Sequence, residues 1–150
     1  MTTKRNKGGD AVTQLLLTTF KLNGRFLEAA DALSAPSGLT AARWQVLGTL
    51  MWRDMTVSEV AREMGLSRQA VQRLANVLAD EGMLTFVDNP GDKRAKLASA
   101  TQAGRDAIGT LRERQHVWAN SVADGVATDE IEAAIALMQK IVDRLPGIVS

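Results

Sequence analysis

Apolar positions follow a helical period over most of this chain, and turn-forming residues interrupt that period at a few defined places. The first periodic stretch begins after Asp10, a candidate N-cap, and predicts a helix over residues 10–35 that Pro36 and Gly38 end. Its apolar positions are Val12, Leu15, Leu16, Phe20, Phe26, Leu27, Ala30 and Leu33. Because such a helix is about twice the usual ~11–12 residues, we expect its apolar stripe to extend beyond a small core and to meet a partner.

A second helix is predicted after Thr40, which is a suitable N-cap. Its apolar side chains Trp44, Leu47, Leu50 and Met51 share one side. Trp44 and Trp52 allow two interpretations, because a tryptophan on a helix either fills the core or lines a pocket for an aromatic ligand. We favour the core for both.

The next two helices are predicted to be joined by a short turn. Thr56 and Glu59 fit a capping box, in which the hydroxyl and the carboxylate each accept from a free backbone amide at the helix start. Gly65 stands where the chain needs a left-handed residue, and Ser67 caps the following helix. The apolar positions that predict the buried faces are Val57, Val60, Ala61 and Met64 in the first helix and Val71, Leu74 and Leu78 in the second. This spacing is typical of a helix-turn-helix.

The opposite face of that second helix is polar and cationic. It carries Arg68, Gln69, Gln72, Arg73 and Asn76, and no acidic residue occurs between Ser67 and Ala79. A solvated surface helix usually alternates acids and bases, so this face is a candidate for contacts with phosphates and base edges.

A basic hairpin is predicted directly after this helix. Residues 83–87 are apolar and β-prone, residues 88–92 are rich in turn formers, and Lys93, Arg94 and Lys96 are expected at the start of the return strand. An isolated basic turn is usually only solvated, but this position favours a wing that reaches the DNA backbone or the minor groove.

Two further amphipathic helices are predicted over residues 101–150. The first is capped by Thr101 and carries Ile108, Leu111, Gln115, Trp118 and Val122 on one stripe, and the second begins near Thr128 and ends before Pro146 and Gly147. With the first helix they present more apolar surface than a small lobe covers, so we expect a homodimer rather than a compact monomer. The basic residues 1–9 are expected to form a mobile tail.

The composition excludes several classes of protein but does not by itself identify the function. The chain has 150 residues, a net charge of +1, no cysteine and one histidine, His116, and it shows neither a signal peptide nor a membrane span. We therefore expect a cytoplasmic protein that is not an enzyme and needs no metal or cofactor, because neither a catalytic triad nor a Cys/His metal site can be assembled.

The stretch from Leu39 to Gly104 resembles the multiple antibiotic resistance regulator (MarR) family. The resemblance rests on Leu39-Thr40 with Trp44, Leu47 and Leu50, on SEVAREMG, on the helix from Ser67, on Leu78-x-x-x-Gly82-Met83-Leu84, on Asp92-Lys93-Arg94 and on Thr101-x-x-Gly104. It implies a mainly α fold with a small β-hairpin wing: a winged helix-turn-helix lobe (39–100) between long N- and C-terminal dimerisation helices. It also implies a homodimer on pseudo-palindromic double-stranded DNA and, in many members, a small aromatic or phenolic anion as effector. The sequence departs from the family pattern in two respects: Phe86 replaces a frequent basic residue, and Ala98-Ser99-Ala100 suggests a lightly packed wing base.

We therefore expect a dimeric transcriptional regulator, and we favour a repressor over an activator. Ser67 would place helix amides near a phosphate, Arg68 would contact a phosphate or a base, and the bases would be read by Gln69, Gln72, Arg73 and Asn76. Arg94 would enter the minor groove, oriented by Asp92, while Lys93 and Lys96 would hold phosphates. The alternatives are a winged-helix protein-interaction module and a ligand-sequestering sensor without DNA binding.

Overall fold

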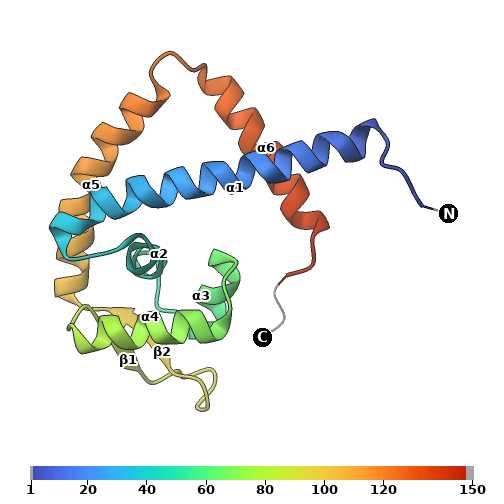
Figure 1. Ribbon diagram of the computed structural model, residues 1–150. Helices are drawn as coiled ribbons and strands as arrows, with labels where there is room; N and C mark the ends of the chain where they lie inside the picture. Colours follow the sequence, from blue (N-terminus) through green and yellow to red (C-terminus); the bar gives the residue numbers. More distant parts are fainter. Residues whose placement is uncertain (1, 148–150) are drawn as a thin grey trace.

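The structure, a computed structural model, describes residues 2–147 and consists mainly of helices with one small antiparallel hairpin (Figure 1). The long α1 (Lys7–Ser34) leads through a short 3-10 helix η1 (Ala35–Ser37) into a compact lobe. The lobe contains α2 (Ala41–Leu50), α3 (Val57–Met64), α4 (Arg68–Asp80), β1 (Leu84–Val87) and β2 (Leu97–Ala100). Two more long helices, α5 (Gln102–Ala123) and α6 (Thr128–Arg144), follow it. The mainly α winged-helix architecture predicted from the sequence is confirmed.

The hydrophobic core lies in the lobe and at the start of α5. Leu47 and Leu50 of α2, Leu78 of α4 and Leu111 of α5 are essentially inaccessible to solvent. By contrast, α6 has no buried residue. Within residues 2–147 no helix is long and apolar enough to cross a membrane.

Side-chain caps fix where most helices begin. Thr40, Thr56 and Ser67 accept hydrogen bonds at the starts of α2, α3 and α4, and Thr101 does so for α5, as the sequence predicts. The full capping box between Thr56 and Glu59 is present.

The predicted start of α1 is wrong. Asn6, not Asp10, is the N-cap, because its side-chain oxygen accepts from Gly9 N at 2.8 Å. Asp10 lies in the first turn, where an acid suits the helix dipole, and it pairs with Arg5 at 3.1 Å. Residues 7–9 of the expected tail are therefore helical.

The hairpin pairs β1 with β2 from Leu84 opposite Ala100 to Val87 opposite Leu97. Lys93, Arg94 and Lys96 precede β2 in the connecting loop, so their predicted place in the return strand is wrong. The cause is local: Asn89 Oδ1 accepts from Gly91 N and Asp92 Oδ1 from Arg94 N, each at 3.0 Å, and these bonds keep the backbone in turns.

The base of the wing is closely packed, contrary to the expectation from its small residues. Ala98 is 1% exposed, and its backbone pairs with that of Met55 through hydrogen bonds of 2.7 and 3.2 Å. A small side chain lets the segment before α3 approach β2 as a third, one-residue partner.

Candidate nucleic-acid interface

The helix α4 is seated so that one face is buried and the other points out of the lobe. Gly65 takes a φ of 65° at the end of α3, which glycine tolerates, and turns the chain into Ser67 and α4. Val71, Ala75 and Leu78 then anchor α4 in the core. The buried face of α4 therefore contains Val71 and Leu78, as predicted, but Ala75 is more deeply buried than the predicted Leu74.

The predicted contact residues of α4 lie outside this buried face. Arg68, Gln69, Arg73 and Asn76 are exposed, while Gln72 is half-buried. Ser67 is half-buried, and its hydroxyl accepts from Ala70 N at 3.1 Å. The side chain of Gln72 donates from Nε2 to Asn76 Oδ1 at 2.9 Å, one helical turn further on.

A cleft of about 280 Å³ brings α4 and the wing together. Arg68 and Gln72 line it from α4, and Arg94 and Lys96 line it from the wing. Phe86 contributes an apolar wall at the position where the family pattern often has a basic residue. The cleft thus unites residues from two segments that the sequence presents separately.

Ser58 is a lining residue of this cleft that the sequence reasoning missed. It stands in the first turn of α3, next to the capping residue Thr56. Its hydroxyl can donate to a phosphate, but a single serine in a helix start gives no distinctive sequence signal. Only the cleft that α3 shares with the wing reveals it.

The cationic side chains of the wing loop are exposed to solvent. The Arg94 side chain is 93% exposed, and its Nε lies 3.5 Å from Asp92 Oδ1. The expected contact between Asp92 and Arg94 is thus present, and Lys93 and Lys96 are exposed beside it.

Positive charge is distributed unevenly over the lobe. On the α2 side, Arg43 pairs with Glu81 at 3.0 Å. Within the part of the chain that the structure describes, Arg68 and Arg73 of α4 make no such pair, and neither do Lys93 and Lys96. Charge without an internal partner attracts an anionic ligand more strongly, because no intramolecular pair must first be broken.

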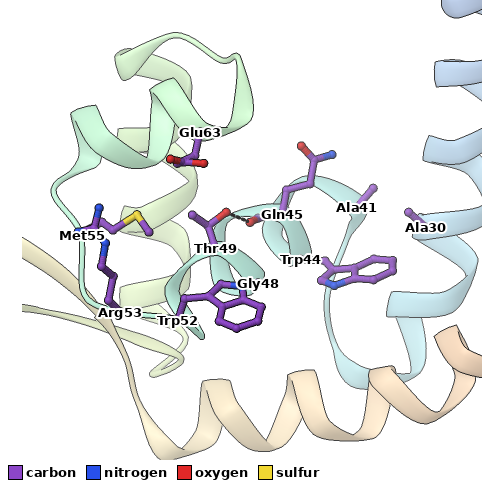
Figure 2. Close-up of a pocket in the computed structure, with 10 residues that line it drawn as sticks. All are labelled: Ala30, Ala41, Trp44, Gln45, Gly48, Thr49, Trp52, Arg53, Met55 and Glu63. Carbon is purple, nitrogen blue, oxygen red and sulfur yellow. Dashed lines mark hydrogen bonds between the residues drawn. The ribbon is translucent and has the colours of Figure 1, made fainter. Parts of the chain in front are cut away.

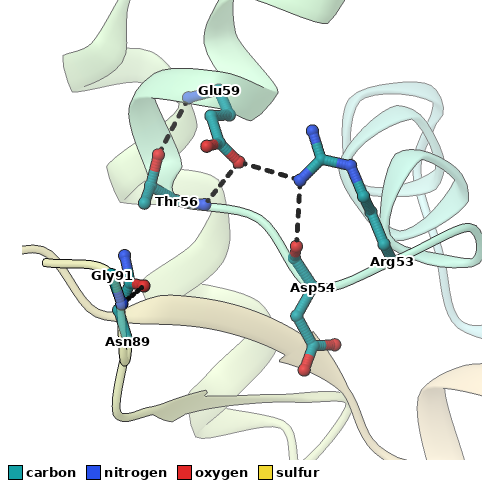
Figure 3. A network of polar contacts seen from close by, with 6 residues as sticks. All are labelled: Arg53, Asp54, Thr56, Glu59, Asn89 and Gly91. Atoms are coloured by element: carbon teal, nitrogen blue, oxygen red, sulfur yellow. Dashed lines mark hydrogen bonds and ion pairs between the residues drawn. The ribbon is translucent and has the colours of Figure 1, made fainter.

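The start of α3 is held by a small polar network (Figure 3). Arg53 donates to Glu59 Oε2 at 3.1 Å and to the Asp54 carbonyl at 3.4 Å. Glu59 in turn accepts from Thr56 N at 3.3 Å. This network fixes α3, the helix on which α4 rests.

A second kind of site lies away from this face, around Trp44 of α2 and Trp52 in the turn that follows α2. An open pocket of about 600 Å³ is lined by Trp44, Trp52, Arg53 and Glu63, among others (Figure 2). Another of about 410 Å³ lies between α2 and α5 and shares Trp44, Gly48 and Trp52 with the first. Its remaining wall includes Arg112 and His116 of α5.

The core interpretation of the tryptophans is wrong for Trp52, which is 89% exposed. Trp52 lies two positions after Leu50, the last residue of α2, where the chain turns toward α3, and its side chain is left largely open to solvent. Trp44 is half-buried and packs against the core while also lining both pockets.

Comparison with known proteins gives consistent matches. The family model described as "MarR family" matches residues 37–95. An uncharacterised protein of Mycobacterium tuberculosis is 32% identical over 136 residues, which are 91% of this chain and 95% of that protein. Among solved structures, mutant MarR from E. coli complexed with operator DNA is 20% identical, with a TM-score of 0.78 over 91% of this chain and 97% of that one. CouR from Rhodococcus jostii RHA1 bound to p-coumaroyl-CoA is 24% identical, with a TM-score of 0.76 over 92% and 95%.

Proposed function

Because this chain belongs to the MarR family of DNA-binding transcription regulators, we propose that it is a homodimeric, ligand-responsive repressor that binds a pseudo-palindromic promoter site. Members of this family regulate transcription and are not enzymes. The observation that carries the proposal is the cleft in which Arg68 and Gln72 of α4 meet Arg94 and Lys96 of the wing. Such a surface presents base-reading and phosphate-binding groups together.

In this proposal α4 enters the major groove. Gln69, Gln72, Arg73 and Asn76 read base edges, Arg68 contacts a base or a phosphate, and Ser67 and the first amides of α4 lie near a phosphate. Arg94 reaches the minor groove while Asp92 limits its motion, and Lys93 and Lys96 bind the backbone. Two copies of α4 then meet half-sites about 34–36 Å apart.

The direct test is fluorescence anisotropy of the full chain with DNA from upstream of its own coding region and with a scrambled duplex, at two salt concentrations. We expect tighter binding to the native sequence and weaker binding to both as salt increases. Equal binding to both duplexes would call for selection of preferred sequences from a random pool. If the selected sequences also bind no more tightly than the scrambled duplex, the protein has no sequence preference and the proposal fails. An absence of binding to any DNA at low salt favours the interaction module or the sequestering sensor.

The effector part of the proposal concerns the pocket between α2 and α5. CouR, a structural neighbour, is bound to p-coumaroyl-CoA. Here Trp44 and Trp52 offer aromatic surfaces, and Arg112 and His116 are the ionisable residues of the lining, with no carboxylate among them. The larger pocket is lined by Glu63 as well as by Arg53, and a carboxylate in the lining is less favourable for an anion. We therefore assign a small aromatic or phenolic anion to the α2–α5 pocket.

The effector is tested by titrating the protein–DNA complex with 4-hydroxybenzoate and 4-coumarate, with the neutral amide of each as control. We expect the acids to release DNA and to quench tryptophan fluorescence, and the amides to do neither. Arg112→Met should weaken the response to the acids, while Glu63→Gln, which changes the charge of the larger pocket alone, leaves it unchanged. If the response to the acids instead changed in the variant of the larger pocket and stayed intact in Arg112→Met, the effector site would be the larger pocket.

A further inference from the structure

The hydrogen bond between Gln72 and Asn76 is the single side chain–side chain hydrogen bond made by α4 residues with one another in the described structure. Gln72 Nε2 donates to Asn76 Oδ1 at 2.9 Å, and the two residues are four positions apart on the proposed base-reading face. A free glutamine or asparagine can rotate its amide and present either a donor or an acceptor. The bond couples the two amides, so that the orientation of one fixes the orientation of the other.

The bond determines which groups each amide has left for a ligand. Gln72 commits one of its two Nε2–H groups, so the other remains available beside its Oε1 acceptor. Asn76 turns its oxygen toward Gln72, and its Nδ2 donors lie on the opposite side of the amide carbon. The pair thus offers a donor and an acceptor at Gln72 and donors at Asn76.

These groups match particular base edges in the major groove. Adenine presents an N6–H donor beside the N7 acceptor, which is complementary to Gln72. Guanine offers O6 and N7, and thymine offers O4, as acceptors for donors such as those of Asn76. Four helical residues span about 6 Å, so the two amides reach base pairs that are neighbours or one step further apart.

We propose that Gln72 and Asn76 read DNA as one hydrogen-bonded unit that selects adenine at Gln72 and an acceptor-bearing edge, guanine or thymine, at Asn76. This rests on the proposed function, since it presumes that α4 enters the major groove. Asn76 has two roles: it contacts its own base and it positions Gln72. A pre-oriented Gln72 loses less side-chain freedom on binding than a free one, and so it discriminates more strongly.

The experiment begins with selection of the preferred site by the full chain from random duplexes. Affinities for every single base-pair change in that site are then measured for wild type, Gln72→Ala, Asn76→Ala and the double variant. Gln45→Ala is the matched control, because Gln45 is an exposed amide on the neighbouring helix α2, outside the proposed DNA contacts and without a side-chain hydrogen bond in the described structure. Circular dichroism confirms that each variant is folded.

We expect Gln72→Ala to abolish a preference for adenine of roughly 5- to 100-fold at one base pair. Asn76→Ala should weaken preference at its own base pair and also at the adenine that it does not touch. The double variant should then lose less than the product of the two single losses, which is the signature of a coupled pair. Gln45→Ala should leave the preference at both of these base pairs intact.

Asn76→Asp separates the two roles of Asn76. A carboxylate still accepts from Gln72, so the preference for adenine should survive, while the lost donors should shift the neighbouring preference toward cytosine, whose N4 donates. Two results would contradict the hydrogen-bonded unit. In one, the effects of Gln72→Ala and Asn76→Ala on base preference are independent. In the other, Asn76→Asp loses as much of the preference for adenine as Asn76→Ala does. Failure of the wild type to select any site would instead contradict the proposed function.

Discussion

Lys93 illustrates how a single exposed cation contributes to DNA affinity. It lies in the wing loop outside any ion pair of the described structure, and we propose that it contacts the phosphate backbone. Lys93→Ala should weaken binding to all sequences alike and reduce the slope of log affinity against log salt by about one unit, because one fewer counterion is released. Anisotropy titrations at several salt concentrations measure this slope.

The control for this prediction is Lys140→Ala, which removes the same charge from α6, far along the chain from the wing. It should leave the salt slope unchanged. A sequence-dependent loss in Lys93→Ala would show that Lys93 reads a base rather than a phosphate.

Gly104 is required by close packing. A Cβ at this position would overlap the backbone carbonyl oxygen of Met83 and lie 3.3 Å from Leu47 Cδ2. Gly104→Ala should therefore destabilise the fold by about 1–3 kcal/mol or more, because a backbone carbonyl cannot move aside as a flexible side chain can. Urea unfolding followed by circular dichroism measures the change.

Gly109, in the same helix α5, provides the matched control. A Cβ there would meet nothing within 4 Å, so Gly109→Ala should stabilise the protein by up to ~1 kcal/mol through helix propensity alone. Equal effects of the two substitutions would contradict the packing explanation for Gly104.

At the scale of elements, α4 is attached to its neighbours at its C-terminal end. Thr101 Oγ1 donates to the Gly82 carbonyl at 2.6 Å, which links this end to the start of α5. Arg43 of α2 binds both carboxylate oxygens of Glu81, at 3.0 and 3.2 Å. A shift of α2 or α5 would therefore be transmitted to α4, the helix proposed to enter the DNA.

The junction between α1 and α5 depends on Arg114. Its Nε donates to the Leu33 carbonyl at 3.0 Å, and its guanidinium also donates to the Ser37 hydroxyl. Arg114→Met should cost about 1–3 kcal/mol of unfolding free energy, because it leaves a partly buried carbonyl without its charged donor. Arg112→Met, two positions earlier and with no hydrogen bond in the described structure, should change stability by under about 0.5 kcal/mol. Similar losses in both variants would show that Arg114 does not hold this junction.

At the scale of the whole molecule, the long helices expose apolar side chains that the lobe does not cover. The large ones include Leu16, Leu17, Phe20 and Phe26 on α1, Val122 on α5 and Ile131, Ile135 and Val142 on α6. α1 and α5 do meet, with the rings of Phe26 and Trp118 edge to face at 6.1 Å, but Phe26 remains 46% exposed. The many exposed apolar side chains on three helices support the proposed homodimer.

Homodimerisation predicts a stability that depends on protein concentration. The urea midpoint should increase with protein concentration, because unfolding then includes dissociation. Phe20→Asp should shift the sedimentation profile toward the monomer, since it places a charge in the buried interface. Thr85→Asp, an exposed change on β1, should leave the profile unchanged. A wild-type monomer at tens of micromolar would contradict the dimer.

Much of this protein follows from its sequence, because the signals are local. Caps such as Thr56 with Glu59, the left-handed Gly65 and the helical period of apolar residues act within one or two turns of chain, and the structure confirms the winged-helix fold that they predict. The polar face of α4 also follows from period alone, since opposite faces of one helix are set by residue spacing.

Other features were decided by contacts between residues far apart in sequence. The pairing of Met55 with Ala98, the approach of Gly104 to Met83 and the meeting of Ser58 and Arg68 with Lys96 all require elements to be placed against each other first. The exposure of Trp52 has the same origin: its sequence neighbours suggest a core residue, but within residues 2–147 its side chain stays 89% exposed. Periodicity states which face of a helix is buried, whereas only the tertiary arrangement states what lies against it.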